Sequence, residues 1–103
     1  MHKIDEVQVV CVAEFHALEG KSEELIAALH SLIQPTHQEE GCLRYELNRR
    51  ADDPRWVTFI EKWQNQEIFD AHCAKPYIAH YFDEVRPKLV DDFKVTLYHE
   101  VLP

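Results

Sequence analysis

The residue with the clearest capacity for chemistry in this sequence is His72. It shares an apolar stripe with Ile68, Phe69, Cys73 and Pro76, on an expected helix that should face a β-sheet. An imidazole titrates near neutral pH, so a histidine beside a pocket can accept the proton of a phenol. The alternative is a core histidine whose ring bonds to a backbone carbonyl. His72 is therefore a candidate general base, and both interpretations stay open.

Aromatic residues alternate with polar ones along the two expected strands that precede this helix. Trp63, Phe59 and Tyr45 fall on inward positions in this register. There they can line a flat pocket and stack on an aromatic substrate, or they can simply fill the core. We treat the three residues as candidate substrate-binding side chains.

Glu61 lies between two of those aromatic positions and also points inward. A carboxylate at this place can contact substrate or orient His72. It can equally form an ordinary ion pair with Arg44 or Lys62, which contributes little to stability when exposed. The pattern leaves these alternatives open.

His80 and Tyr81 follow His72 by about two helical turns, with Phe82 directly after them. From that position they can close the mouth of a pocket next to His72. They can also face solvent or a second subunit. We include His80 and Tyr81 among the candidate substrate-binding residues.

The sequence gives little support for a metal or cofactor site. His72 and Cys73 are consecutive, and His72 and His80 are not at the i, i+4 spacing of a helical chelate. GxGxxG, GxxxxGK and HExxH motifs do not occur. Cys73 does not form a catalytic pair with His72 by sequence proximity, because neighbours on a helix point about 100° apart. We expect neither a metal nor a cofactor.

Composition and charge limit the partners that this chain can have. It has 103 residues with 11 Lys and Arg against 19 Asp and Glu, so its formal net charge is −8. Nucleic acids and anionic membranes are recognised through clustered cations, which makes both poor partners here. The chain shows neither an apolar run long enough to span a membrane nor an apolar signal core in residues 1–6. Cys11, Cys42 and Cys73 are expected to be buried free thiols, and we predict a cytoplasmic protein.

Hydrophobic periodicity predicts four strands and two helices, each helix interrupted by a proline. Pro35 should interrupt the first helix, which Ser22 is expected to cap. Asn65 should cap the second helix, which restarts at Pro76 and runs to Pro87. The strands are expected at 7–15, 42–48, 56–63 and 92–101.

The order β-α-β-β-α-β is typical of the ferredoxin-like fold, an α+β architecture in which two helices cover one face of a four-stranded antiparallel sheet. We interpret residues 1–103 as a single domain. The other sheet face should carry an apolar set that needs a cover: Val10, Val12, Thr58, Ile60, Thr96 and Tyr98. A second copy packed sheet to sheet would provide it, so we predict a homodimer through this face.

Four short motifs resemble the antibiotic biosynthesis monooxygenase family, and together they extend over most of the chain. They are Ala13-Glu14-Phe15 followed by Gly20-Lys21, the run from Glu39 to Leu47, Phe59-Ile60-Glu61-Lys62-Trp63, and Phe69-Asp70-Ala71-His72 leading to Pro76-Tyr77-Ile78. The resemblance implies a dimeric α/β barrel with a pocket between helices and sheet. In several members it also implies oxidation of phenols, anthrones or quinols by O2 without metal or flavin.

Other branches of this family include haem-degrading enzymes and an isomerase of a phosphorylated autoinducer, so the resemblance leaves the reaction open. The haem-degrading members carry an asparagine on the first strand where this sequence has Ala13, which argues against haem degradation. Three functions are therefore weighed. The first is a cofactor-independent monooxygenase for a small quinol, anthrone or polyphenol. The second is an isomerase of a small phosphorylated carbonyl compound, and the third is a dimeric ligand-binding module without turnover.

Overall fold

The computed structural model describes residues 7–101, so residues 1–6, which are expected to lack an apolar signal core, lie outside the described residues. Four strands form one antiparallel sheet in the order β2-β3-β1-β4. The strands are β1 Val9–Ala17, β2 Cys42–Arg49, β3 Trp56–Trp63 and β4 Val90–Tyr98. The helices are α1 Ser22–His30, α2 Ile33–His37, α3 Gln66–Cys73, α4 Pro76–His80, the π-helical turn η1 Tyr81–Val85, and α5 Arg86–Leu89. This is the predicted ferredoxin-like α+β fold.

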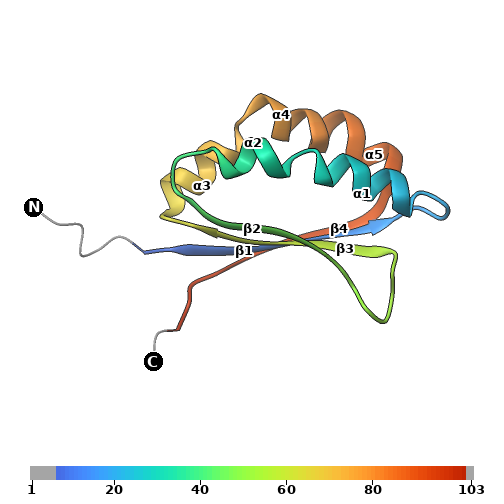
Figure 1. Ribbon diagram of the computed structural model, residues 1–103, viewed down its shortest axis with the longest axis horizontal. Coiled ribbons are helices and arrows are strands. Elements are labelled where there is room, and N and C mark those ends of the chain that lie inside the picture. The colour runs from blue at the N-terminus through green and yellow to red at the C-terminus, as the bar shows by residue number, and fades with distance from the viewer. Residues whose placement is uncertain (1–6, 102–103) are drawn as a thin grey trace, which may run out of the picture.

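The helices lie together on one side of the sheet (Figure 1). Along β1 and β3, side chains alternate between buried positions under the helices and partly exposed positions on the other face. This alternation is what period-2 patterning predicts for a sheet with one covered face. The six residues expected on the open face are all partly or largely exposed there, and Tyr98 is 51% exposed.

Both helical regions are interrupted, as the prolines predict. The first region breaks between α1 and α2, with Pro35 in the first turn of α2. The second breaks before Pro76, which begins α4 because its missing amide is tolerated in a first turn. The side chain of Asn65 caps α3 by accepting a hydrogen bond from the Ile68 amide at 2.8 Å. Ser22, by contrast, does not cap α1: Lys21 occupies that position without a side-chain cap.

The expected bounds of β1 and β4 were wrong by a few residues. β1 begins at Val9 instead of Val7, and β4 begins at Val90 because the ladder shifts register between His16 and Ala17, which brings Val90 opposite Ala17. The helical region runs past Pro87 to Leu89, since that proline sits in the first turn of α5. Val101 lies beyond β4 and is 93% exposed.

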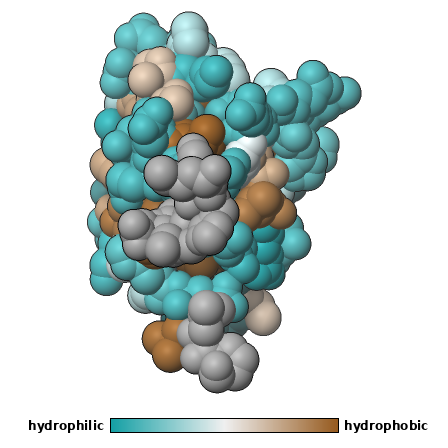
Figure 2. Space-filling model, turned by 90° about the vertical axis from the view of Figure 1, so that its left-hand side faces the viewer, coloured by the Kyte–Doolittle hydropathy of each residue, from teal (hydrophilic) through white to brown (hydrophobic). Residues whose placement is uncertain are grey.

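The cysteines are free thiols, as predicted, but they are not all buried. Cys11 is buried on β1, Cys42 is half-buried, and Cys73 is exposed at the end of α3. The start of β1 and the end of β4 lie at the same end of the sheet (Figure 1). Seen from that end, hydrophilic side chains cover most of the surface, with separate hydrophobic patches between them (Figure 2). The part of the chain that the structure describes contains no helix long and apolar enough to cross a membrane.

Candidate active site

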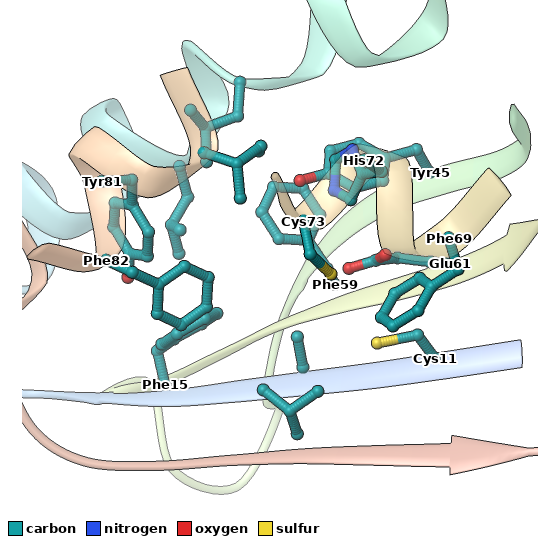
Figure 3. Close-up of a pocket in the computed structure, with 15 residues that line it drawn as sticks. Cys11, Phe15, Tyr45, Phe59, Glu61, Phe69, His72, Cys73, Tyr81 and Phe82 are labelled. Carbon is teal, nitrogen blue, oxygen red and sulfur yellow. The ribbon is translucent and has the colours of Figure 1, made fainter. Parts of the chain in front are cut away.

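A small pocket, partly open to solvent, lies between the helices and the sheet (Figure 3). The walls are mostly apolar and come from β1, β2, β3, β4 and the helices above them. Among the residues that line it, Glu61 carries a carboxyl group and His72 an imidazole.

His72 reaches the pocket from α3 and is almost completely buried. Its ring lies 4.3 Å from the Trp63 ring, centroid to centroid, and Tyr45 approaches it edge-on. Its Nδ1 lies 3.0 Å from Oε2 of Glu39, so this nitrogen donates the hydrogen bond to the carboxylate. Among the described residues Nε2 has no hydrogen-bond partner, which leaves it as the acceptor that a ligand can meet.

Burial is the main influence on the protonation of His72. It lowers the pKa of the ring below 6.5, because the charged form loses its hydration, while the hydrogen bond and negative charge of Glu39 act in the opposite direction. His72 is therefore neutral at pH 7. A neutral imidazole whose Nε2 has no partner among the described residues can take up a proton. The alternative, a ring bonded to a backbone carbonyl, is not what the structure shows, because Nδ1 bonds to the carboxylate of Glu39.

Sequence reasoning did not identify Glu39 as a site residue. It lies just after α2, its side chain is 10% exposed, and it is 33 positions from His72 in the sequence. The hydroxyl of Tyr77 donates to the same Oε2 atom. The one feature of the sequence that pointed to this segment was the motif Glu39-Glu40-Gly41. Its glycine adopts a positive φ of 83°.

Gly41 helps to place Glu39. A Cβ atom at this position would lie 2.7 Å from Cγ2 of Ile68 on α3, so only glycine permits the close approach of the two segments. The carbonyl of Gly41 also accepts a hydrogen bond from the Gln64 amide at 2.9 Å. These contacts hold the chain before β2 against the start of α3, the helix that carries His72.

Glu61 is buried in the pocket wall on β3. Its carboxylate accepts a hydrogen bond from Nε1 of Trp63 at 2.9 Å. Burial raises its pKa to about 7, although the hydrogen bonds from Trp63 and Cys11 reduce the effect. Glu61 therefore exists in both protonation states near neutral pH.

The expected partners of Glu61 were wrong. Arg44 pairs with Glu46, and Lys62 pairs with Glu100, so neither cation faces the pocket. His72 is oriented by Glu39 instead of Glu61. Glu61 fixes the indole ring of Trp63, on which His72 rests.

Two of the three aromatic candidates line the pocket, and the third packs against His72. Tyr45 and Phe59 line the pocket and stack on each other with centroids 4.2 Å apart. Trp63 is completely buried and supports His72 from behind, so it is not part of the pocket wall.

The two candidates on the second helical region have different places. Tyr81 lines the pocket from η1, and its ring meets Phe15 edge-on at 5.4 Å between centroids. His80, the last residue of α4, is exposed and does not line the pocket. The expectation that both residues close one pocket mouth was therefore wrong for His80.

The structure gives little support for nucleophilic catalysis by Cys73 or for a metal site among the described residues. Although Cys73 is exposed as a residue, partial burial of its thiol at the pocket wall raises the pKa to about 11, with further increases from nearby carboxylates, so the thiol stays protonated at neutral pH. The described residues contain no group of three or more His, Cys, Asp or Glu side chains that could hold a metal ion. Ala13, at the position where haem-degrading relatives are expected to carry an asparagine, lines the pocket with a methyl group.

Comparison with known proteins identifies the family. The family model for antibiotic biosynthesis monooxygenases matches residues 8–84. The chain belongs to this family. Two curated relatives are each 30% identical to it: the Synechocystis protein sll1783 over 82 residues, and Rv0793 of Mycobacterium tuberculosis, provisionally named a monooxygenase, over 89 residues. The matches cover 80% and 86% of this chain, but 55% and 87% of the respective relatives.

Solved structures of similar proteins agree with the fold. The Shewanella oneidensis protein SO0527 is 56% identical, with a TM-score of 0.91 and 95% of both chains covered. A Deinococcus radiodurans protein, provisionally described as an antibiotic biosynthesis monooxygenase, is 25% identical, with a TM-score of 0.83 over 92% of this chain and 94% of its own. The resemblance inferred from the sequence motifs is thus confirmed at the level of family and fold.

Proposed function

We propose that this protein is a cofactor-independent monooxygenase that oxidises a small quinol, anthrone or polyphenol with O2. The observation that carries the proposal is the neutral His72 ring, which Glu39 holds at the wall of an apolar pocket with Nε2 unpartnered among the described residues. Family membership supports an oxidoreductase, and the pocket supports the substrate class. His72 is the proposed general base.

The proposed reaction starts with proton transfer from a substrate hydroxyl, or from the acidic carbon of an anthrone, to Nε2 of His72. The resulting anion gives one electron to O2, which forms superoxide and a substrate radical. These recombine with formation of a C–O bond to a ring carbon that carries hydrogen. His72 returns its proton to the peroxide, the O–O bond breaks, and water leaves with the carbon's hydrogen to give a quinone carbonyl. One oxygen atom of O2 enters the product and the other enters water.

The apolar pocket walls suit this chemistry because an aromatic substrate bound against them would displace water from around the reactive anion and radical. Tyr45 and Phe59 provide flat surfaces for an aromatic ring, and Tyr81 borders the opposite side (Figure 3). Glu61 is placed to bind a second hydroxyl group in either protonation state. General-base assistance of this kind is worth about 10²–10⁴ in rate.

The assembly and compartment are part of the same proposal. The apolar open face of the sheet suits a second copy packed across a two-fold axis, so we propose a homodimer with one pocket in each subunit. The three free thiols suit a reducing compartment, which favours the cytoplasm. The proposed partners are thus a small aromatic substrate, O2 and a second copy of the chain, without nucleic acid or membrane.

The alternative of an isomerase for a small phosphorylated carbonyl compound has weaker support. A phosphate group binds best to arginine or lysine, and the residues that line the pocket include neither. Arg44 and Lys62 are engaged by carboxylates elsewhere. A ligand-binding module without turnover remains the competing outcome of the test below.

The test is O2 consumption with a panel of quinols, anthrones and polyphenols, corrected for uncatalysed oxidation. We expect wild type and the control variant His30→Ala, which alters an exposed histidine, to consume O2 at equal rates. His72→Ala should be about 10²–10⁴ slower. With ¹⁸O2, the quinone should carry one labelled oxygen. Equal rates for His72→Ala and wild type, or no uptake with any substrate, would refute the proposal.

A further inference from the structure

A hydrogen-bond network behind His72 joins three segments of the helical layer. Thr36 Oγ1 on α2 lies 3.0 Å from the Tyr77 hydroxyl on α4. That hydroxyl donates to Oε2 of Glu39, and the same oxygen lies 3.0 Å from Nδ1 of His72 on α3. The network thus brings together residues up to 41 positions apart in the sequence.

The burial of this network makes its composition informative. Thr36 is completely buried, and the side chains of Glu39 and His72 are 10% and 5% exposed. A carboxylate removed from water is costly unless it receives hydrogen bonds, and Glu39 receives two at one oxygen. An apolar side chain would fill the same space without that cost, so packing alone does not account for a glutamate here.

We propose that Glu39 is a positioning residue for the base, supported by Tyr77. It holds the proton of His72 on Nδ1, keeps Nε2 directed to the pocket as a proton acceptor, and stabilises the ring when it becomes charged. Glu39 does this without touching substrate, since it lies on the far side of the ring and does not line the pocket. The inference rests on the proposed function for its catalytic consequence, but its effect on the ring is independent of any substrate.

Several other ionisable groups lie around His72 and set the background for a titration. Lys75, just after α3, lowers the pKa of the ring, whereas Glu39 raises it. Tyr45 on β2, Glu61 on β3, Cys73 on α3 and Tyr77 on α4 complete the surroundings. Of these charges, Glu39 is the one in direct contact with the ring through a hydrogen bond.

The test is the ¹⁵N NMR titration of the His72 ring in the full chain, without substrate. In wild type we expect a neutral ring protonated at Nδ1. Glu39→Gln keeps the shape and one acceptor but removes the charge, so the pKa of His72 should fall further. Glu40→Gln, which changes the adjacent exposed carboxylate, should leave the titration unchanged. An unchanged pKa and tautomer in folded Glu39→Gln would overturn the inference.

A second variant gives an effect of opposite sign. Tyr77→Phe removes the hydroxyl that shares Oε2, so more negative charge remains for His72 and its pKa should rise. If the network were purely structural, the pKa of His72 would shift in the same direction in both variants or would not shift at all. This comparison also remains informative if Glu39→Gln is less stable than wild type.

Kinetics separate this inference from the proposed function. With an active quinol, Glu39→Gln should lower kcat by less than the about 10²–10⁴-fold expected for loss of the base itself, with little change in KM, and the acidic limb of the kcat/KM profile should move to lower pH. If the wild type oxidises no substrate but the NMR shift is observed, the oxygenase proposal fails and the positioning role stands. If the wild type is active and the shift is absent, the positioning role fails alone.

Discussion

Replacing Glu61 with glutamine should change how the stability of the protein depends on pH. Below pH 4.5 the carboxyl group is protonated in both the folded and the unfolded chain. Between pH 4.5 and about 7 the unfolded chain releases this proton while the folded chain keeps it, because burial raises the pKa of Glu61 to about 7. The free energy of unfolding contributed by this group therefore falls as the pH rises.

The size of the effect follows from the two pKa values. The difference between 4.5 and about 7 corresponds to about 3 kcal/mol at 1.36 kcal/mol for each pH unit. Glutamine has nearly the same shape and can still accept the hydrogen bond from Trp63, but it does not titrate. Glu61→Gln should thus gain stability relative to wild type as the pH increases from 4.5 to 7.

The assay is urea unfolding of both proteins at one protein concentration and several pH values between 4.5 and 7.5. His72 acts in the opposite direction, because its lowered pKa makes the folded state less stable as the pH falls below 6.5, but it is present in both proteins. Glu40→Gln is the matched control and should show no such trend. A stability difference between wild type and Glu61→Gln that does not vary with pH would refute the reasoning.

Three further changes test the fold around the site. Trp63→Phe removes the donor to Glu61 and should cost at least about 2 kcal/mol in urea unfolding, while raising the pKa of Glu61 further in a ¹³C NMR titration; an unchanged pKa would contradict the role given to Trp63. Gly41→Ala should destabilise the protein more than Gly20→Ala. Both glycines have a positive φ, which costs alanine about 1–2 kcal/mol, but only a Cβ at position 41 would also clash, with Ile68. Equal losses of stability in urea unfolding would argue against the close approach of Gly41 to Ile68. Ile60→Glu on the open sheet face should convert the proposed dimer to a monomer in light scattering; a monomeric wild type would remove this interface.

The strands and their faces could be predicted because alternation has a period of two: every second residue of β1 is apolar, and so is every covered residue of β3 except Glu61. The breaks between α1 and α2 and between α3 and α4 could be predicted, because Pro35 and Pro76 each lack the amide hydrogen that would continue the preceding helix. The start of β4 could not be predicted, because Val90 joins the sheet only through a register shift opposite Ala17. The shift arises from how β1 and β4 pair, so the sequence of neither strand alone indicates it.

The site was predictable to the extent that it depends on one helix and its facing strand. His72 reaches the pocket because a helical stripe fixed its direction, and Tyr45, Phe59 and Glu61 follow from strand register. Glu39 was missed because its contact with His72 is between segments distant in sequence, and nothing local distinguishes it from the exposed Glu40. The partners of Glu61 were missed because alternation gives the face of a strand but not the contacts across it.

The most direct test of the account is a crystal structure of the protein with a quinol bound in the absence of O2. The account predicts a hydroxyl oxygen of the ligand within about 2.6–3.2 Å of Nε2 of His72, with the aromatic ring between Tyr45 and Tyr81 and Nδ1 still bonded to Glu39. A ligand bound elsewhere, or a His72 ring turned so that Nε2 bonds to the protein, would contradict it.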